Sequence, residues 1–272
     1  AIRGLAAIFN LKTYPLSVTK AGTGTGTVTS DPGSINCGTH CSEAFDHGAT
    51  ITLTATPDAS STFTGWSGAC TGTEACHVTL EEANSVTASF ALKRYTVTAT
   101  AGANGAIDPL TRDLDHGATT SFTVTPDTGY SASVSGCGGS LTGSTYTTGP
   151  ITAACGVSAT FSLNSYTLTT TVSPSGAGAV SCTAYLVLHG GSSTCTATAN
   201  PGYSFQSWSG DCVGAICELT NITTNKSVTA NFSLNTYILA VTKAGTGTGT
   251  VTSDPGTIDC GTNCQEAFEH GA

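Results

Sequence analysis

One closing segment recurs four times in the sequence, and this recurrence constrains the fold more than any other feature. In each copy, apolar residues occupy alternate positions and the last residue is a phenylalanine. A period of two is typical of a strand with one buried face. Each phenylalanine is followed by a leucine two positions later and by a tyrosine five positions later. The segments are Leu5–Phe9, Val86–Phe90, Val157–Phe161 and Val228–Phe232.

The tyrosine after each closing segment marks the start of a new unit, so the sequence predicts a tandem array. Residues 1–13 are then the last strand of a preceding repeat, and residues 237–272 are the first half of a fourth one. The complete repeats are 14–94, 95–165 and 166–236.

A longer period lies on top of the first. Residues 14–49 and 237–272 are identical at 29 of 36 positions, and their offset of 223 is the summed length of the complete repeats. We therefore expect a triplet of repeats to be the larger building block. We also expect the native polypeptide to continue in both directions.

Each repeat is expected to be an all-β module with little or no helix. The chain is rich in Thr and Val, whose branched side chains suit a pleated sheet. For residues 14–94 the pattern predicts five strands, and the segment that holds Phe63 and Trp66 is expected to be a loop. The expected strands lie around Leu16–Val18, Thr27–Thr29, Thr50–Thr56, His77–Leu80 and Val86–Phe90.

The charge of the chain argues against several classes of partner. The net charge is −9 and there are only 8 Lys and Arg residues. Nucleic acids and anionic membrane surfaces need a dense basic face, which this composition cannot supply. No apolar run approaches the roughly 20 residues that span a bilayer. We expect no nucleic-acid partner and no membrane insertion of this segment.

The cysteines predict a disulfide framework. There are 12, and they fall into close pairs, which persist as disulfides only in oxidising compartments. The chain has no signal peptide, so we expect a mature or internal piece of an exported protein, secreted or on the cell surface. The expected pairs are Cys37–Cys41, Cys70–Cys76, Cys137–Cys155, Cys182–Cys195, Cys212–Cys217 and Cys260–Cys264.

Metal sites are the alternative interpretation of the polar residues. Cys37, His40 and Cys41 have the spacing of metal ligands, but His40 becomes Asn263 in the matching repeat and leaves too few ligands. Acidic residues beside prolines do not form the series that Ca²⁺ needs, and solvated turns explain them better: Asp31, Asp108, Asp127 and Asp254. No metal and no cofactor are expected.

The histidines and tryptophans also have two interpretations. His47, His116, His189 and His270 each precede a glycine at the same turn. A repeated turn residue is usually structural, and no nucleophile accompanies it, so we expect no catalytic residue and no enzyme activity. Trp66 and Trp208 are expected to fill the cores of their repeats. Sugar-facing tryptophans would instead make a multivalent lectin.

These blocks together resemble a known module. The order Thr50–Pro57, Phe63–Cys70 and Val86–Phe90, with an opening such as Tyr166–Thr171, is similar to the divergent internalin-B-type B-repeat. The resemblance covers nearly the whole chain and is weakest in the second repeat, which has Val134 in place of the tryptophan. It implies a small β-grasp-like or sandwich module in exported bacterial proteins, without catalytic residues.

The sequence therefore favours a structural role. Only four residues separate each closing Phe from the next Tyr, without Gly or Pro, so we expect a semi-rigid array acting as a stalk, surface spacer or fibre. The expected partner is the chain itself, through array or fibre contacts. The alternative is an adhesin that binds a glycan or a surface protein.

Overall fold

The computed structural model describes residues 8–272, which form strands and no helix. The prediction of an all-β fold built from repeated small sheets is confirmed. The first strand begins at Thr13, so most of the closing strand expected in residues 1–13 lies outside the described residues. Within that described range no helix is long and apolar enough to cross a membrane.

The first repeat consists of two sheets. One has the strand order β3-β1-β7-β5 and the other has the order β2-β4-β6. The strands are β1 (Thr13–Ala21), β2 (Gly26–Asp31), β3 (Ser42–Asp46), β4 (Thr50–Pro57), β5 (Ser61–Gly68), β6 (Cys76–Thr79) and β7 (Asn84–Leu92).

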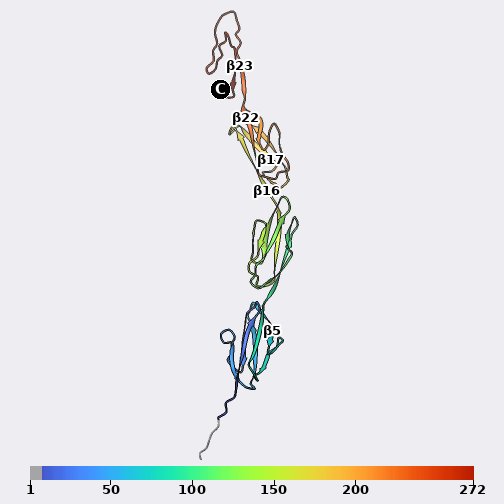
Figure 1. Ribbon diagram of the computed structural model, residues 1–272. Helices are drawn as coiled ribbons and strands as arrows, with labels where there is room; N and C mark the ends of the chain where they lie inside the picture. The colour runs from blue at the N-terminus through green and yellow to red at the C-terminus, as the bar shows by residue number, and fades with distance from the viewer. Residues whose placement is uncertain (1–7) are drawn as a thin grey trace, which may run out of the picture. The chain divides into compact units, whose positions relative to one another are not determined.

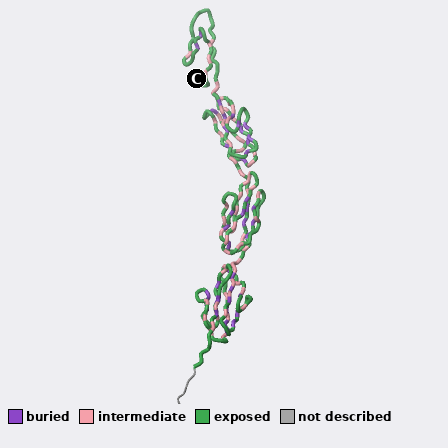
Figure 2. Tube along the Cα trace, viewed as in Figure 1, coloured by how far each residue is buried: buried purple, intermediate pink, exposed green. Residues whose placement is uncertain are grey.

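The two sheets of this repeat pack face to face around one apolar core. Leu16 and Phe90 come from the first sheet and Ile51 and Leu53 from the second, and all are fully buried or nearly so. Buried and exposed positions alternate along the strands in Figure 2, as a strand with one inner face requires. The module is therefore a small sandwich rather than a β-grasp-like fold, the other fold that the resemblance implies.

The first and last strands of the repeat are neighbours in the middle of one sheet. β1 and β7 run parallel, with Val18 opposite Val86. Because parallel strands point the same way, the chain enters this repeat at one end and leaves it at the other. The same parallel pairing joins β8 to β15 and β16 to β22 in the next two repeats.

The second and third repeats keep this plan (Figure 1). The second has sheets β10-β8-β15-β12 and β13-β14-β11-β9, and the third has β18-β16-β22-β20 and β17-β19-β21. The second contains β8 (Arg94–Ala101), β9 (Gly105–Asp108), β10 (Thr111–Asp115), β11 (Ser121–Pro126), β12 (Tyr130–Gly136), β13 (Ser140–Thr142), β14 (Thr145–Thr147) and β15 (Cys155–Leu163). The third contains β16 (Ser165–Ser173), β17 (Gly178–Cys182), β18 (Leu186–Leu188), β19 (Ser193–Ala199), β20 (Tyr203–Gly210), β21 (Cys217–Leu219) and β22 (Lys226–Leu234).

The last segment, residues 237–272, corresponds to the opening part of the first repeat. It pairs β23 (Thr236–Ala240) with β24 (Gln265–Glu269), the counterparts of β1 and β3. The contacts between residues divide the chain into two compact units. One unit contains residues 1–126 and 132–161, and the other contains residues 127–131 and 162–272.

The prediction of five strands for the first repeat is wrong, because the structure has seven. The segment Ser61–Gly68, expected to be a loop, is strand β5. Its register shifts between Phe63 and Gly65, which inserts one extra residue. This bulge lets Phe63 and Trp66 both reach the core although they are three positions apart, and it hides the alternation on which the prediction depended. The other missed strand is β3, a short edge strand.

Candidate functional site: the junctions between repeats

The cysteines all lie in disulfides that clip loops or neighbouring strands within a repeat. Cys182 and Cys195 face each other across the β17–β19 ladder, whereas Cys137 joins the end of β12 to Cys155 at the start of β15. The bonds join the pairs expected from the sequence: Cys37–Cys41, Cys70–Cys76, Cys137–Cys155, Cys182–Cys195, Cys212–Cys217 and Cys260–Cys264.

Both tryptophans lie inside their repeats. Trp66 is 5% exposed and Trp208 is 3% exposed, so neither presents a ring face to a sugar. The indole N–H of Trp66 donates to the backbone oxygen of Glu74 at 2.8 Å, and its ring packs edge-on against Phe63 at 5.0 Å. This placement removes the surface on which the lectin interpretation depended.

The second repeat fills its core differently, which the sequence reasoning missed. Val134 replaces the tryptophan there, and Tyr146 of β14 is fully buried. Tyr146 pairs with Phe122 in the ladder position where the first repeat pairs Val78 with Ile51. A larger residue on one strand therefore compensates for a smaller one on another, and the tyrosine hydroxyl donates to the backbone oxygen of Gly136. Aligning the repeats could have revealed this, because Trp66 and Val78 of the first repeat align with the smaller Val134 and the larger Tyr146 of the second.

The turn histidines pack against the tyrosines that open each repeat. The ring centroids of His47 and Tyr14 are 5.8 Å apart, and those of His189 and Tyr166 are 5.9 Å apart. The other two repeats have the same pair at 6.1 and 6.0 Å. Within residues 8–272, no group of three or more His, Cys, Asp and Glu side chains is arranged so that it could hold a metal ion. The four acidic turn residues singled out above are all exposed.

One backbone residue joins each repeat to the next. The N–H of Asn164 donates to the oxygen of Gly129 in the repeat before it, at 2.8 Å. The oxygen of Asn164 accepts from the N–H of His189 in the repeat after it, also at 2.8 Å. Lys93 makes the same two bonds with Ser60 and His116. Asn235 makes them with Gly202 and His270 at the third junction.

Side chains strengthen two of these junctions. The hydroxyl of Ser131 donates to the amide oxygen of Asn164, and that of Ser204 donates to the amide oxygen of Asn235. Lys93 has no such amide, so the first junction relies on its backbone bonds. The sequence reasoning recognised the short spacing at these positions but not the residue that holds it.

The position of the histidine at a junction also explains why a glycine occupies the turn that faces it. Gly129 has a φ of 86°, which favours glycine, and a Cβ there would come within 2.4 Å of the His189 ring. Gly202 is alike, because a Cβ there would lie 2.1 Å from the His270 ring. At the second and third junctions, the turn of one repeat thus leaves room for the imidazole of the next. The first junction has Ser60 at this place.

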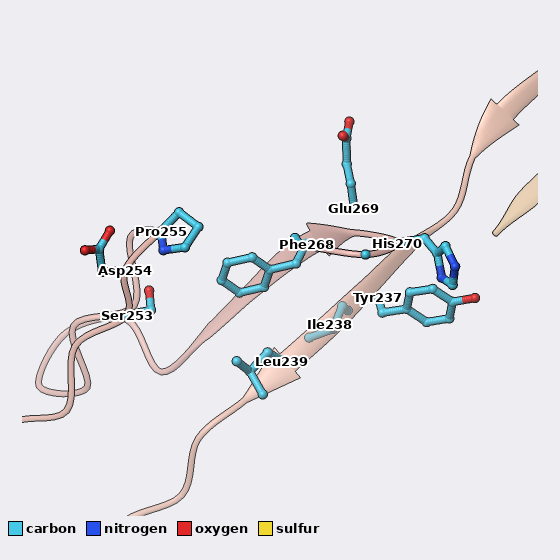
Figure 3. A pocket seen from close by; sticks show the side chains of 11 residues that line it. Tyr237, Ile238, Leu239, Ser253, Asp254, Pro255, Phe268, Glu269 and His270 are labelled. Carbon is cyan, nitrogen blue, oxygen red and sulfur yellow. The ribbon is translucent and has the colours of Figure 1, made fainter. Parts of the chain in front are cut away.

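A shallow pocket in the last segment has a structural origin. Tyr237, Leu239, Phe268 and Pro255 line it, between the strands and the loop shown in Figure 3. Leu239 is 51% exposed, whereas its counterpart Leu16 in the first repeat is fully buried beneath the second sheet. The pocket is therefore lined by the face that corresponds to the buried side of the sheet in the first repeat. Ser253, Asp254, Glu269 and His270 also line it.

The family comparison agrees with this repeat organisation. The model of the divergent InlB B-repeat domain matches residues 16–94, 95–165 and 168–236. Comparison with curated proteins finds no match. Among solved structures, a match is "The Bacillus anthracis TIE protein", with 8% identity and a TM-score of 0.37 over 80% of this chain, which spans half of that structure's length. The family model covers well over half of the sequence, and the chain therefore belongs to the divergent InlB B-repeat family.

Proposed function

We propose that this chain is a non-catalytic segment of an extracellular stalk, surface spacer or fibre, whose repeats carry tension along the polypeptide. The observation that carries the proposal is the parallel pairing of the first and last strands in every complete repeat. The six disulfides and the family support an oxidising, extracellular location.

The strand pairing decides how a repeat responds to force. When the ends of the first repeat are pulled, β1 and β7 are drawn in opposite directions along their common axis. Six residues of each strand, Leu16–Ala21 and Asn84–Ser89, are in register along this ladder. Their hydrogen bonds are loaded in shear and must break together, which needs more force than opening them one at a time.

The junctions extend this argument from one repeat to the next. At each junction a single residue is bonded to both neighbours through its own N–H and C=O, so little free chain separates two repeats. Local stability is then a sum of repeat and nearest-neighbour terms, as in other tandem arrays. An array of this kind suits the spacing of a partner from a surface.

Single-molecule pulling tests the proposal. We expect the oxidised chain, held by its termini, to give three separate force peaks, one for each complete repeat. As a control, handles at the N-terminus and in the turn at Gly48 open the antiparallel β1–β3 ladder from one end, because Thr13 lies opposite Asp46. This geometry should yield at a lower force. A smooth extension without peaks, or equal forces in the two geometries, would rule out the tension-bearing role.

A further inference from the structure

The outer edge strand that pairs with the opening tyrosine can be compared across all four repeats. Tyr14 lies opposite Phe45, Tyr95 opposite Leu114, Tyr166 opposite Val187 and Tyr237 opposite Phe268. The strands β3, β10, β18 and β24 are therefore aligned residue by residue. Their flanking positions can be compared directly.

The third repeat differs from the others at this edge. The position after the inward apolar residue is Asp46, Asp115 or Glu269 in three repeats, but it is Leu188 in β18. Leu188 is 57% exposed, and Leu186 on the same face is 64% exposed. Each of the other three edge strands carries at least two charged residues, and β18 carries none.

Charge on an edge strand is a usual protection against pairing with another chain. On a chain with a net charge of −9, the acidic edges of β3 and β24 would repel the same edges of another copy. β18 lacks this protection and adds two exposed leucines. The opposite edge of its sheet is protected in another way, since β20 is bulged and Trp208 bridges to Gly214 of the following loop.

The backbone of β18 is oriented for pairing. Tyr185 O accepts from Leu168 N, and His189 N donates to Asn164 O, so the odd-numbered residues face β16. In an antiparallel ladder the residues between them direct their N–H and C=O groups to the other side. Leu186 and Leu188 therefore present theirs to the free edge, although Leu188 O also accepts from Gly191 N.

We infer that β18 pairs antiparallel with β18 of a second copy of this chain, about a twofold axis at Val187. This inference rests on the proposed function, for which it supplies the lateral self-contact. A second copy fits because the edge is self-complementary: the axis places Leu186 opposite Leu188 of the other copy in both directions, and like charges are absent from the contact.

The pairing has two structural consequences. The sheets β20-β22-β16-β18 of the two copies become one continuous sheet of eight strands. The exposed leucines of both copies gather on its outer face, beside the threonine and serine residues of β16. Such an isologous contact closes on itself, so it joins arrays in pairs and leaves their length unchanged.

The experiment is sedimentation of the oxidised full chain over a range of concentrations. We expect the average mass to rise from the 27.1 kDa of one chain toward twice that value. Exchange of the Leu186 and Leu188 amides should slow over the same range. Leu188→Asp should abolish both effects without unfolding, because the first two repeats carry Asp at this position.

Two further variants separate strand pairing from general stickiness. Leu110→Asp removes a leucine that is 60% exposed in another repeat, and it should dimerise like the wild type. Leu186→Pro keeps an apolar residue but removes the outward N–H, and it should be monomeric. A monomeric wild type overturns the inference and leaves this edge to a peptide of another protein. Dimers of Leu188→Asp or Leu186→Pro overturn it as well.

The pulling experiment keeps the two proposals distinguishable. Leu188→Asp should retain the three force peaks, because the β16–β22 ladder does not include β18. Loss of dimers with intact peaks leaves the stalk function standing. Dimers without peaks would refute the stalk function alone.

Discussion

The imidazole of His189 occupies the space that a side chain at Gly129 would need, since a Cβ at that glycine would lie 2.4 Å from the ring. The two residues belong to consecutive repeats in the sequence, and Asn164 bonds to the backbone of both. The junction is thus a packed contact as well as a short connection. This has consequences for substitutions at the glycine.

Gly129→Ala should destabilise the junction through both strain and overlap. A φ of 86° costs an alanine about 1 kcal/mol, and displacing the ring adds a comparable amount. Gly117→Ala is the matched control, because its φ is 84° but no atom lies within 4 Å of its Cβ. We expect Gly129→Ala to lower the free energy of unfolding, measured by urea denaturation, by about 1 kcal/mol more than the control.

A double-mutant cycle tests separately the overlap between a Cβ at position 129 and the His189 ring. His189→Ala removes the ring, so Gly129→Ala should then cost no more than the backbone strain alone. Equal costs of Gly129→Ala with and without the histidine would contradict the packed junction.

Much of this architecture could be predicted from the sequence, because it depends on periods. Alternation at Val86–Phe90 and its recurrence indicate strands and repeats before any coordinates are known. Strand β5 could not be predicted in this way, since the bulge at Gly65 breaks the period of two. The two backbone hydrogen bonds of Asn164 could not be predicted either, because any residue type can make a hydrogen bond with its backbone groups.

In the second repeat, we expect substitutions at Tyr146 and Val134 to compensate for each other. Tyr146→Val should cost about 3 kcal/mol in free energy of unfolding, because it opens a cavity and leaves Gly136 O without its hydroxyl donor. Adding Val134→Trp restores the combination that the first repeat uses at Trp66 and Val78. The double variant should recover part of the loss in urea denaturation. No recovery would mean that the two positions do not share one cavity.

The disulfides should differ in how much they contribute to the free energy of unfolding, according to the length of the loop that each one closes. Cys137–Cys155 spans 18 residues, and on the chain-entropy model its removal costs about 3 kcal/mol. Cys37–Cys41 spans only 4 residues and should cost about 2 kcal/mol. Paired alanine variants, compared by urea denaturation without reductant, test this order. The reverse order would show that native packing, rather than loop closure, sets the difference.

The ion pair of the third repeat gives a pH-dependent prediction. Lys226 Nζ lies 2.8 Å from Asp211 Oδ1, and this hydrogen bond, with a second from the Ser227 N–H, holds the pKa of Asp211 below its ordinary value of 3.8. A carboxylate with a lowered pKa stabilises the fold above its unfolded pKa and loses that contribution as the pH falls through the folded pKa. Asp211→Asn should therefore cost about 1 kcal/mol at pH 7.

The gap between Asp211→Asn and the wild type should close as the pH drops below about 4, near the ordinary pKa of aspartate. Asp115→Asn is the control, because Asp115 and Arg94 form a pair that is 3.4 Å apart and more than half exposed on both sides. Solvent screens such a pair, so its loss should change stability by less than about 0.5 kcal/mol at any pH. Urea denaturation at pH 7 and pH 3 measures both variants. An Asp211→Asn gap that stays constant between these two values would exclude the carboxylate as its source.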